Sequence, residues 1–192
     1  DFVPTRIVST SELKTASDDW FSDFNNTGVA TIATGRMAAR TASDAQLMVS
    51  KTVAYSTGAA GSWNGQALLV ADTDDPDISF TQAAQSVQGL LPSSLNATDV
   101  FAGSLGTSTA NQNIVSEINS GQLLVNYNGH GSVQVWGAGG LFDDTMAASL
   151  TNGNKLPFFV IMNCLNGFFQ DVYTQSLAES LMLAPNGGAV AV

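Results

Sequence analysis

Two short apolar runs, each followed by a glycine-containing motif, constrain this chain more than any other feature. Residues 122–127 (QLLVNY) and 156–162 (LPFFVIM) have the length and composition of strands buried inside a sheet. The interval between them has the length of a crossover with one helix, and residues 143–150 are a suitable helix. Two neighbouring parallel strands joined by a helix are therefore predicted.

The rest of the chain alternates in the same way between strand-like and helix-like segments. Further strands are predicted at residues 3–8, 29–33, 66–71 and 98–102, with another from residue 189. Further helices are predicted at residues 42–53, 81–91, 110–119 and 175–183. This order is typical of an α/β domain whose mostly parallel central sheet is flanked by helices. The chain has 192 residues, of which 44% are hydrophobic, so we expect one domain with a packed core.

Charge and composition limit the partners and the location that we expect for this chain. The formal net charge is −10, from 16 acidic and 6 basic residues, so we expect no nucleic-acid partner. No apolar run reaches the roughly 20 residues of a transmembrane helix. The few lysines and many small polar residues are typical of a secreted or surface protein. The chain starts at Asp1 and ends in an apolar segment, so we expect it to be a fragment of a longer chain.

Residues able to do chemistry stand where the two predicted strands end. The first strand runs into NYNGHGS (126–132) and the second into IMNCLNG (161–167). The carboxyl ends of parallel strands meet at one edge of a sheet, so His130 and Cys164 are expected to lie close together. They are the chain's one histidine and one cysteine, which excludes an internal disulfide and a cysteine-rich zinc site.

A cysteine beside a histidine is a pairing that nucleophilic catalysis uses. A thiol is only weakly ionised at neutral pH, and an imidazole can accept its proton and later protonate a leaving amine. The tetrahedral intermediate needs backbone N–H donors, which Gly131 and Cys164 could supply. Taken singly, Cys164 could be a small buried hydrophobe and His130 a hydrogen-bonded loop residue. Their joint placement favours catalysis.

At these motifs the sequence resembles the gingipain-like cysteine peptidases, which are relatives of caspases and legumains. The resemblance spans nearly the whole chain. The similar stretches are SDDWF (17–21), TGRM (34–37), LLVAD (68–72), YNGHGS (127–132), WG (136–137), LPFF (156–159), NCLNGFF (163–169), SLAE (176–179) and GGAVA (187–191).

The resemblance implies a caspase-like fold, with residues 1–192 forming a single caspase-like peptidase domain. It also implies a bacterial or archaeal cysteine endopeptidase, secreted or at the cell surface, that hydrolyses peptide bonds through an acyl-thioester. His130 corresponds to the family's catalytic histidine and Cys164 to its nucleophile. The expected partners are a protein or peptide substrate and the remaining domains of the same precursor.

The family's third, acidic member, which orients the histidine, is not fixed by the pattern. Asp72 and Asp74 are candidates because they follow a predicted strand, and Asp18 and Asp19 are weaker ones. Residues 72–77 also have other interpretations, as a solvated acidic turn or as a structural calcium-binding loop. Apart from that calcium, no metal or cofactor is expected.

Substrate preference is not predicted. Trp136 follows the histidine motif and either walls the pocket for the P1 side chain or packs its loop onto the sheet. In caspase-like peptidases, residues beyond the final GGAVA segment help to form the substrate groove.

Three other functions share these features. The chain could be a catalytically silent caspase-fold module for surface adhesion or assembly, or a carbohydrate- or calcium-binding surface domain. It could also be a transpeptidase, in which an amine replaces water on the same acyl-enzyme. An unreactive thiol would favour the binding functions over the enzymes.

Overall fold

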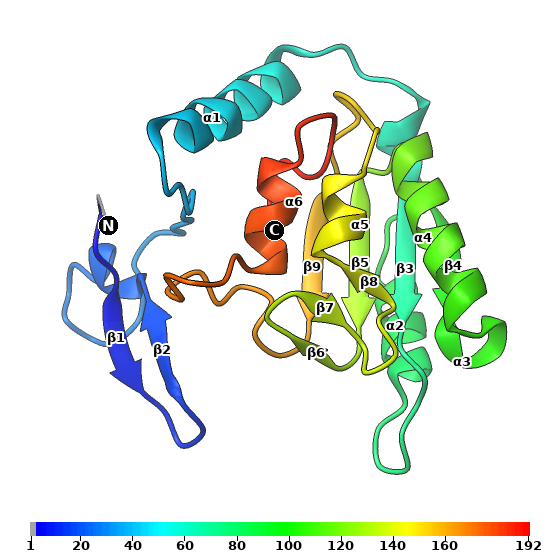
Figure 1. Cartoon of the computed structure of the whole chain (residues 1–192), viewed down its shortest axis with the longest axis horizontal. Coiled ribbons are helices and arrows are strands. Elements are labelled where there is room, and N and C mark those ends of the chain that lie inside the picture. Colours follow the sequence, from blue (N-terminus) through cyan, green and yellow to red (C-terminus); the bar gives the residue numbers. More distant parts are fainter. Residues whose placement is uncertain (1–2) are drawn as a thin grey trace.

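A four-stranded sheet forms the centre of the molecule in the computed structural model, which describes residues 3–192 (Figure 1). The strands stand in the order β4-β3-β5-β9, and every neighbouring pair is parallel. Their bounds are Gln66–Ala71 for β3, Asn96–Phe101 for β4, Leu124–Asn128 for β5 and Phe158–Met162 for β9. Strands β5 and β9 correspond to the strands predicted at residues 122–127 and 156–162.

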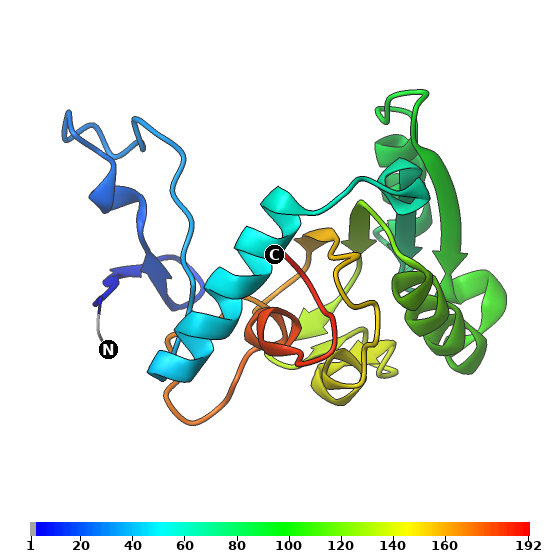
Figure 2. The same ribbon diagram turned by 90° about the horizontal axis from the view of Figure 1, so that it is seen from above.

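Helices cover both faces of this sheet. Figure 2 shows α4, α5 and α6 on one face and α2 on the other. The bounds are Ala42–Thr57 for α1, Phe80–Gln88 for α2, Ala102–Leu105 for α3, Thr107–Ser120 for α4, Asp144–Ala148 for α5 and Leu177–Leu183 for α6. Two 3-10 turns lie at Asp19–Phe21 and Ser62–Gly65.

The larger hydrophobic core lies between the sheet and α4, α5 and α6. Side chains alternate along a strand, so Leu68 of β3 and Val125 and Tyr127 of β5 all point into it and are fully buried. Complete burial of a side chain such as that of Leu68 or Val125 stabilises the fold by about 1.5–3 kcal/mol. On the opposite face, Phe80 of α2 packs near Ala71 in a smaller cluster.

Helix α6 begins at a site that its sequence specifies. Ser176 and Glu179 form a capping box, in which each side chain accepts a hydrogen bond from the other residue's backbone N–H. Glu179 is only 2% exposed, and Arg40 pairs with it at 3.0 Å. The same guanidinium donates to the carbonyl oxygens of Asp171 and Thr174, so it holds the segment that leads into α6.

Two smaller sheets accompany the central one. Strands β1 (Arg6–Ser9) and β2 (Lys14–Ser17) form an antiparallel hairpin that stands beside the main body (Figure 1). Strands β6 (Gly131–Ser132), β7 (Val135–Trp136) and β8 (Phe142–Asp143) form a short antiparallel sheet between β5 and α5.

The predicted α/β architecture, a mostly parallel sheet flanked by helices, is confirmed. The strand predicted at residues 29–33 is wrong: this segment is irregular, and Val29 and Ile32 are 68% and 56% exposed. No helix within residues 3–192 is long and apolar enough to cross a bilayer. That residues 1–192 form a single peptidase domain stays a prediction.

Candidate active site

The pairing of β5 with β9 brings the histidine and cysteine motifs to one edge of the sheet. Asn128, the last residue of β5, stands opposite Met162, the last residue of β9. Beyond this pair the backbone N–H of Gly129 still donates to the carbonyl oxygen of Met162, at 3.4 Å. The loop with His130 and the turn with Cys164 therefore leave the sheet side by side.

Gly131 shows how closely this loop and this turn approach each other. A Cβ atom added at Gly131 would collide with the side-chain amide of Asn163 and would lie 3.2 Å from the carbonyl oxygen of Cys164. Only glycine fits this position without displacing the Asn163 side chain or one of the two segments. The backbone of the histidine loop is thus in direct contact with the cysteine turn.

The Cys164 thiol is exposed to solvent. The next residue, Leu165, has a left-handed backbone with φ of +67°, which is uncommon for a residue with a branched side chain. Such strained residues concentrate at functional sites, where the surrounding structure enforces them. The interpretation of Cys164 as a small buried hydrophobe is therefore wrong.

Asp75 is the carboxylate that meets the His130 imidazole. Its Oδ2 lies 2.9 Å from Nε2 of His130, and the histidine side chain is 56% exposed. Its Oδ1 accepts the backbone N–H groups of Asp77 and Ile78, which fix the carboxylate in place. The hydrogen bond with His130 lowers the pKa of Asp75, and the backbone hydrogen bond from Asp77 adds to this. Phe80 supports the ring in an edge-on contact at 5.0 Å between centroids.

Asp72 and Asp74, the favoured candidates for the acidic partner of His130, form other hydrogen bonds in the structure. Asp72 accepts the backbone N–H of His130 at 3.3 Å, so it supports the loop rather than the imidazole. Asp74 accepts hydrogen bonds from the Ser79 hydroxyl at 2.6 Å and the Thr81 N–H at 2.9 Å, at the start of α2. The ring nitrogen of His130 is hydrogen bonded to Asp75 and to neither of these carboxylates.

The weaker candidates lie in the amino-terminal segment. Asp18 forms a two-pronged ion pair with Arg36, whose Nε and Nη2 lie 2.5 and 2.9 Å from its oxygens. That hydrogen bond lowers the pKa of Asp18. Asp19 opens a 3-10 turn. The carboxylate that contacts the imidazole lies in the turn 72–77 but at Asp75, which the sequence did not single out, because the choice among these carboxylates depends on the backbone path of the turn. The identity of the acidic third member stays a prediction.

The carboxylates of the acidic turn do not form a cluster of three in the part of the chain that the structure describes. No group of three His, Cys, Asp or Glu side chains within residues 3–192 is arranged to hold an ion. The carboxylates of Asp72, Asp74 and Asp75 instead accept hydrogen bonds from their own and neighbouring loops. A structural calcium ion stays a prediction.

Tyr127 and Trp136 support the histidine loop from the hydrophobic core. The Tyr127 hydroxyl donates to the carbonyl oxygen of His130 at 2.7 Å, and burial raises the pKa of this phenol far above its usual value. The Trp136 ring stacks on Tyr127 with centroids 4.3 Å apart and is fully buried. Of the two interpretations of Trp136, the structure favours packing, because a fully buried indole offers no surface to a substrate.

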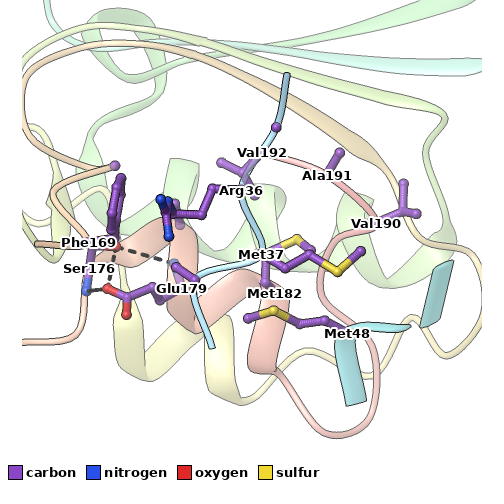
Figure 3. Close-up of a pocket in the computed structure, with 14 residues that line it drawn as sticks. Arg36, Met37, Met48, Phe169, Ser176, Glu179, Met182, Val190, Ala191 and Val192 are labelled. Atoms are coloured by element: carbon purple, nitrogen blue, oxygen red, sulfur yellow. Dashed lines mark hydrogen bonds between the residues drawn. The ribbon is translucent and has the colours of Figure 1, made fainter. Parts of the chain in front are cut away.

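Two cavities adjoin segments that follow Cys164, and neither His130 nor Cys164 lines them. A cavity of about 430 Å³ opens between the amino-terminal segment and α6, lined by apolar side chains that include Met37, Met48 and Met182 (Figure 3). A smaller cavity of about 240 Å³ adjoins the cysteine turn at Asn163 and Leu165.

A helix-covered parallel sheet with a cysteine and a histidine at its carboxyl edge is a caspase-like architecture, and solved structures agree with it. The crystal structure of the Arg-specific cysteine proteinase gingipain R is 27% identical, with a TM-score of 0.83 over 98% of this chain and 44% of that one. The complex of Porphyromonas gingivalis RgpB pro- and mature domains is 26% identical, with a TM-score of 0.79 over 95% of this chain and 44% of that one.

Sequence comparison then gives the family. The model of Peptidase family C25 matches residues 1–192, so the chain belongs to Peptidase family C25. Gingipain R2 of Porphyromonas gingivalis is 31% identical over 161 residues, which are 80% of this chain and 21% of that protein. Gingipain R1 of the same species is also 31% identical over 161 residues, which are 16% of its length. The chain thus spans about a fifth of the length of these relatives.

Proposed function

We propose that this chain carries the catalytic pair of a cysteine endopeptidase, with Cys164 as the nucleophile and His130 as its base. The observation that supports this most is the parallel pairing of β5 and β9, after which the chain's one histidine and one cysteine follow on adjacent segments. Membership of Peptidase family C25 supports the same reaction class.

The proposed reaction is the hydrolysis of a peptide bond through an acyl-thioester. The Cys164 thiol gives its proton to His130, and the sulfur attacks the carbonyl carbon of the scissile peptide bond. Backbone N–H groups of Gly131 and Cys164 bind the oxyanion. His130 then protonates the leaving amine, which leaves an acyl-thioester, and water attacks this thioester to release the acid.

Asp75 takes the orienting role in this proposal. Its Oδ2 faces Nε2 of His130. The N–H at Nε2 therefore donates a hydrogen bond to the carboxylate, and Nδ1 is left as the basic nitrogen. When His130 holds the second proton, the negative charge of Asp75 stabilises the imidazolium. Both side chains are partly exposed, so water and salt screen this interaction.

The substrate, partners and location are parts of the same proposal. A protein or peptide is the substrate, and the remaining domains of a longer precursor are partners, because the matched relatives are several times longer. A secreted or cell-surface location fits the few basic residues and the net charge of −10.

A peptide-hydrolysis assay tests this function. The intact precursor-derived protein is incubated with a peptide library, and cleavage is followed by mass spectrometry. We expect cleavage that Cys164→Ser and His130→Ala abolish, and the cleaved sequences give the P1 residue. Added amines that become joined to the acyl product would show a transpeptidase instead. No cleavage and no acyl-enzyme from the folded, intact protein would contradict the proposal and favour a silent adhesion or assembly module.

A further inference from the structure

Asn166 links the cysteine turn to the histidine loop through its side chain. It lies two residues after Cys164 and is 4% exposed. Its Nδ2 donates to the carbonyl oxygen of Ser132 in a short hydrogen bond and lies 3.4 Å from that of Val135. Its Oδ1 accepts a hydrogen bond of 2.6 Å from Nδ2 of Asn163. One buried amide thus contacts both sides of the candidate dyad.

Backbone hydrogen bonds join a third element to the same point. The carbonyl oxygen of Asn166 accepts the N–H of Ala178 at 3.0 Å, and the carbonyl oxygen of Val133 accepts the N–H of Leu177 at 2.8 Å. The start of α6 therefore binds the cysteine turn and the histidine loop at once. The Asn166 side chain stands where these three segments meet.

The chemistry of this position suits asparagine. The two acceptors on the histidine loop are carbonyl oxygens and need a donor, whereas the Asn163 amide needs an acceptor. A buried polar atom without its partner is destabilising by about 1–3 kcal/mol, so a side chain with only one of these functions leaves an unsatisfied group. The left-handed backbone at Leu165 lies between Cys164 and this anchor, and the anchor helps to enforce it.

We infer that Asn166 is a positioning residue, which holds the Cys164 turn at its distance from the His130 loop. The inference rests on the proposed function, because it concerns the same pair. Asn166 acts through the backbone of the two segments and takes no part in bond making.

The test replaces Asn166 by a side chain whose donor depends on pH. In Asn166→Asp the new carboxylate faces two carbonyl oxygens at pH 8 and cannot donate to them. Burial beside two carbonyl oxygens raises the pKa of such a carboxyl above its usual value, so its protonated form gains population towards pH 5 and can donate again. The rate of Cys164 alkylation by iodoacetamide is measured from pH 5 to 8 and divided by the wild-type rate at each pH. Misplacement by about 1 Å can slow a reaction about a hundredfold. We therefore expect the Asn166→Asp variant to be alkylated at about one tenth of the wild-type rate or less at pH 8, and the ratio of the two rates to rise towards one at pH 5.

Asn152 provides a matched control at the opposite edge of the sheet. It is 1% exposed, its Nδ2 donates to the carbonyl oxygens of Lys155 and Gly188 at 2.9 Å each, and its Oδ1 accepts the Gly188 N–H. It lies before β9, whereas Cys164 lies after that strand. Asn152→Asp should lower the Tm in a similar way but leave the alkylation ratio near one at every pH.

Each outcome is informative. An Asn166→Asp ratio that stays near one, or that matches the ratio of Asn152→Asp, contradicts the inference while the proposed function stands. A wild-type Cys164 that reacts no faster than free cysteine contradicts the proposed function and the inference with it. If Asn166→Asp does not fold at pH 8, Asn163→Ala takes its place, because it removes only the contact to Oδ1. A smaller loss of rate is then expected, and an unchanged rate contradicts the inference.

Discussion

Asp72, Asp74 and Asp75 occupy one short turn, yet each has a different task. Asp72 binds the backbone of the histidine loop, Asp74 binds the start of α2, and Asp75 binds the imidazole of His130. The position of His130 after a strand could be predicted from the sequence, because the end of a strand is visible in the local pattern of residues. The partner of the imidazole is set by the fold of a separate turn, which the pattern of apolar residues does not encode.

Asp75→Asn tests the orienting role of this carboxylate. Asparagine keeps the acceptor for the backbone N–H groups but loses the charge that faces His130. We expect Cys164 alkylation at pH 7 to slow about tenfold, less than the roughly hundredfold or more that a group transferring the proton itself contributes, because Asp75 acts through His130 and the pair is partly exposed. The effect should shrink in 1 M salt, where the Debye length is about 3 Å. Asp74→Asn is the control in the same turn, and an equal loss in both variants would count against the role.

Gly131→Ala tests the close approach of the loop and the turn. The added Cβ would collide with the Asn163 amide and lie 3.2 Å from the Cys164 carbonyl oxygen, so the Asn163 side chain or the two segments must move. We expect a loss of alkylation rate and of peptide hydrolysis by about tenfold or more, as for a misplaced reacting group. Gly35→Ala, whose added Cβ would have no atom within 4 Å, should behave as wild type. Wild-type rates in Gly131→Ala would contradict a role of this close approach in placing Cys164 beside His130.

At the scale of elements, the buried strands could be predicted and the irregular segments could not. Strands β3 and β5 lie in the middle of the sheet, so both are buried on their two faces and contain apolar runs that are easily recognised. The buried Asn126 and Asn128 of β5 are the exceptions, and their side-chain amides are hydrogen bonded. Residues 29–33 have a similar local composition but find no partner strand, because sheet formation requires a second segment that the local pattern does not reveal. For the same reason the hairpin partner of β1 was not predicted.

The contact between α1 and α6 contains a buried cation with a predictable effect on stability. Lys51 of α1 is 8% exposed, and its Nζ donates to the carbonyl oxygen of Met182 in α6 at 2.8 Å. Burial lowers the pKa of Lys51 from 10.5 to about 8. Between these values the unfolded chain binds more protons than the folded one, so the free energy of unfolding rises with pH in this window.

Urea unfolding of wild type and Lys51→Met from pH 6 to 10.5 measures this effect. The difference in unfolding free energy between the two should be constant below about pH 8. Above that pH it should shift steadily in favour of the wild type, because the neutral amine no longer carries a buried charge. Comparison with the variant cancels the titration of other groups. A difference that is independent of pH up to 10.5 would show that Lys51 is not buried against α6.

At the scale of the whole molecule, Arg36 connects the amino-terminal β1–β2 hairpin to the domain built on the central sheet. Its guanidinium pairs with Asp18, just after β2, and donates to the carbonyl oxygen of Val3. It also lies over the ring of Phe169, 4.9 Å from the centroid, on the segment that follows Cys164 (Figure 3). One arginine therefore connects the hairpin with the segment beyond the candidate nucleophile.

Arg36→Gln should loosen the hairpin and leave the sheet intact. Hydrogen bonds to charged groups contribute about 1.5–3 kcal/mol each, so the open population should rise about tenfold or more. Limited proteolysis followed by mass spectrometry should show faster cuts within residues 3–35. Arg6→Gln, at an exposed position of β1, is the control. Equal digestion of the two variants would mean that Arg36 does not hold the hairpin.

The central claim, that His130 activates Cys164, is tested most directly by the alkylation rate of the wild-type thiol. Iodoacetamide is reacted with the intact, folded protein near neutral pH, with free cysteine as the reference and His130→Ala as the comparison. We expect Cys164 to react much faster than free cysteine and His130→Ala to remove most of this advantage. A wild-type thiol that reacts at the rate of free cysteine or slower, with no effect of His130→Ala, would contradict it.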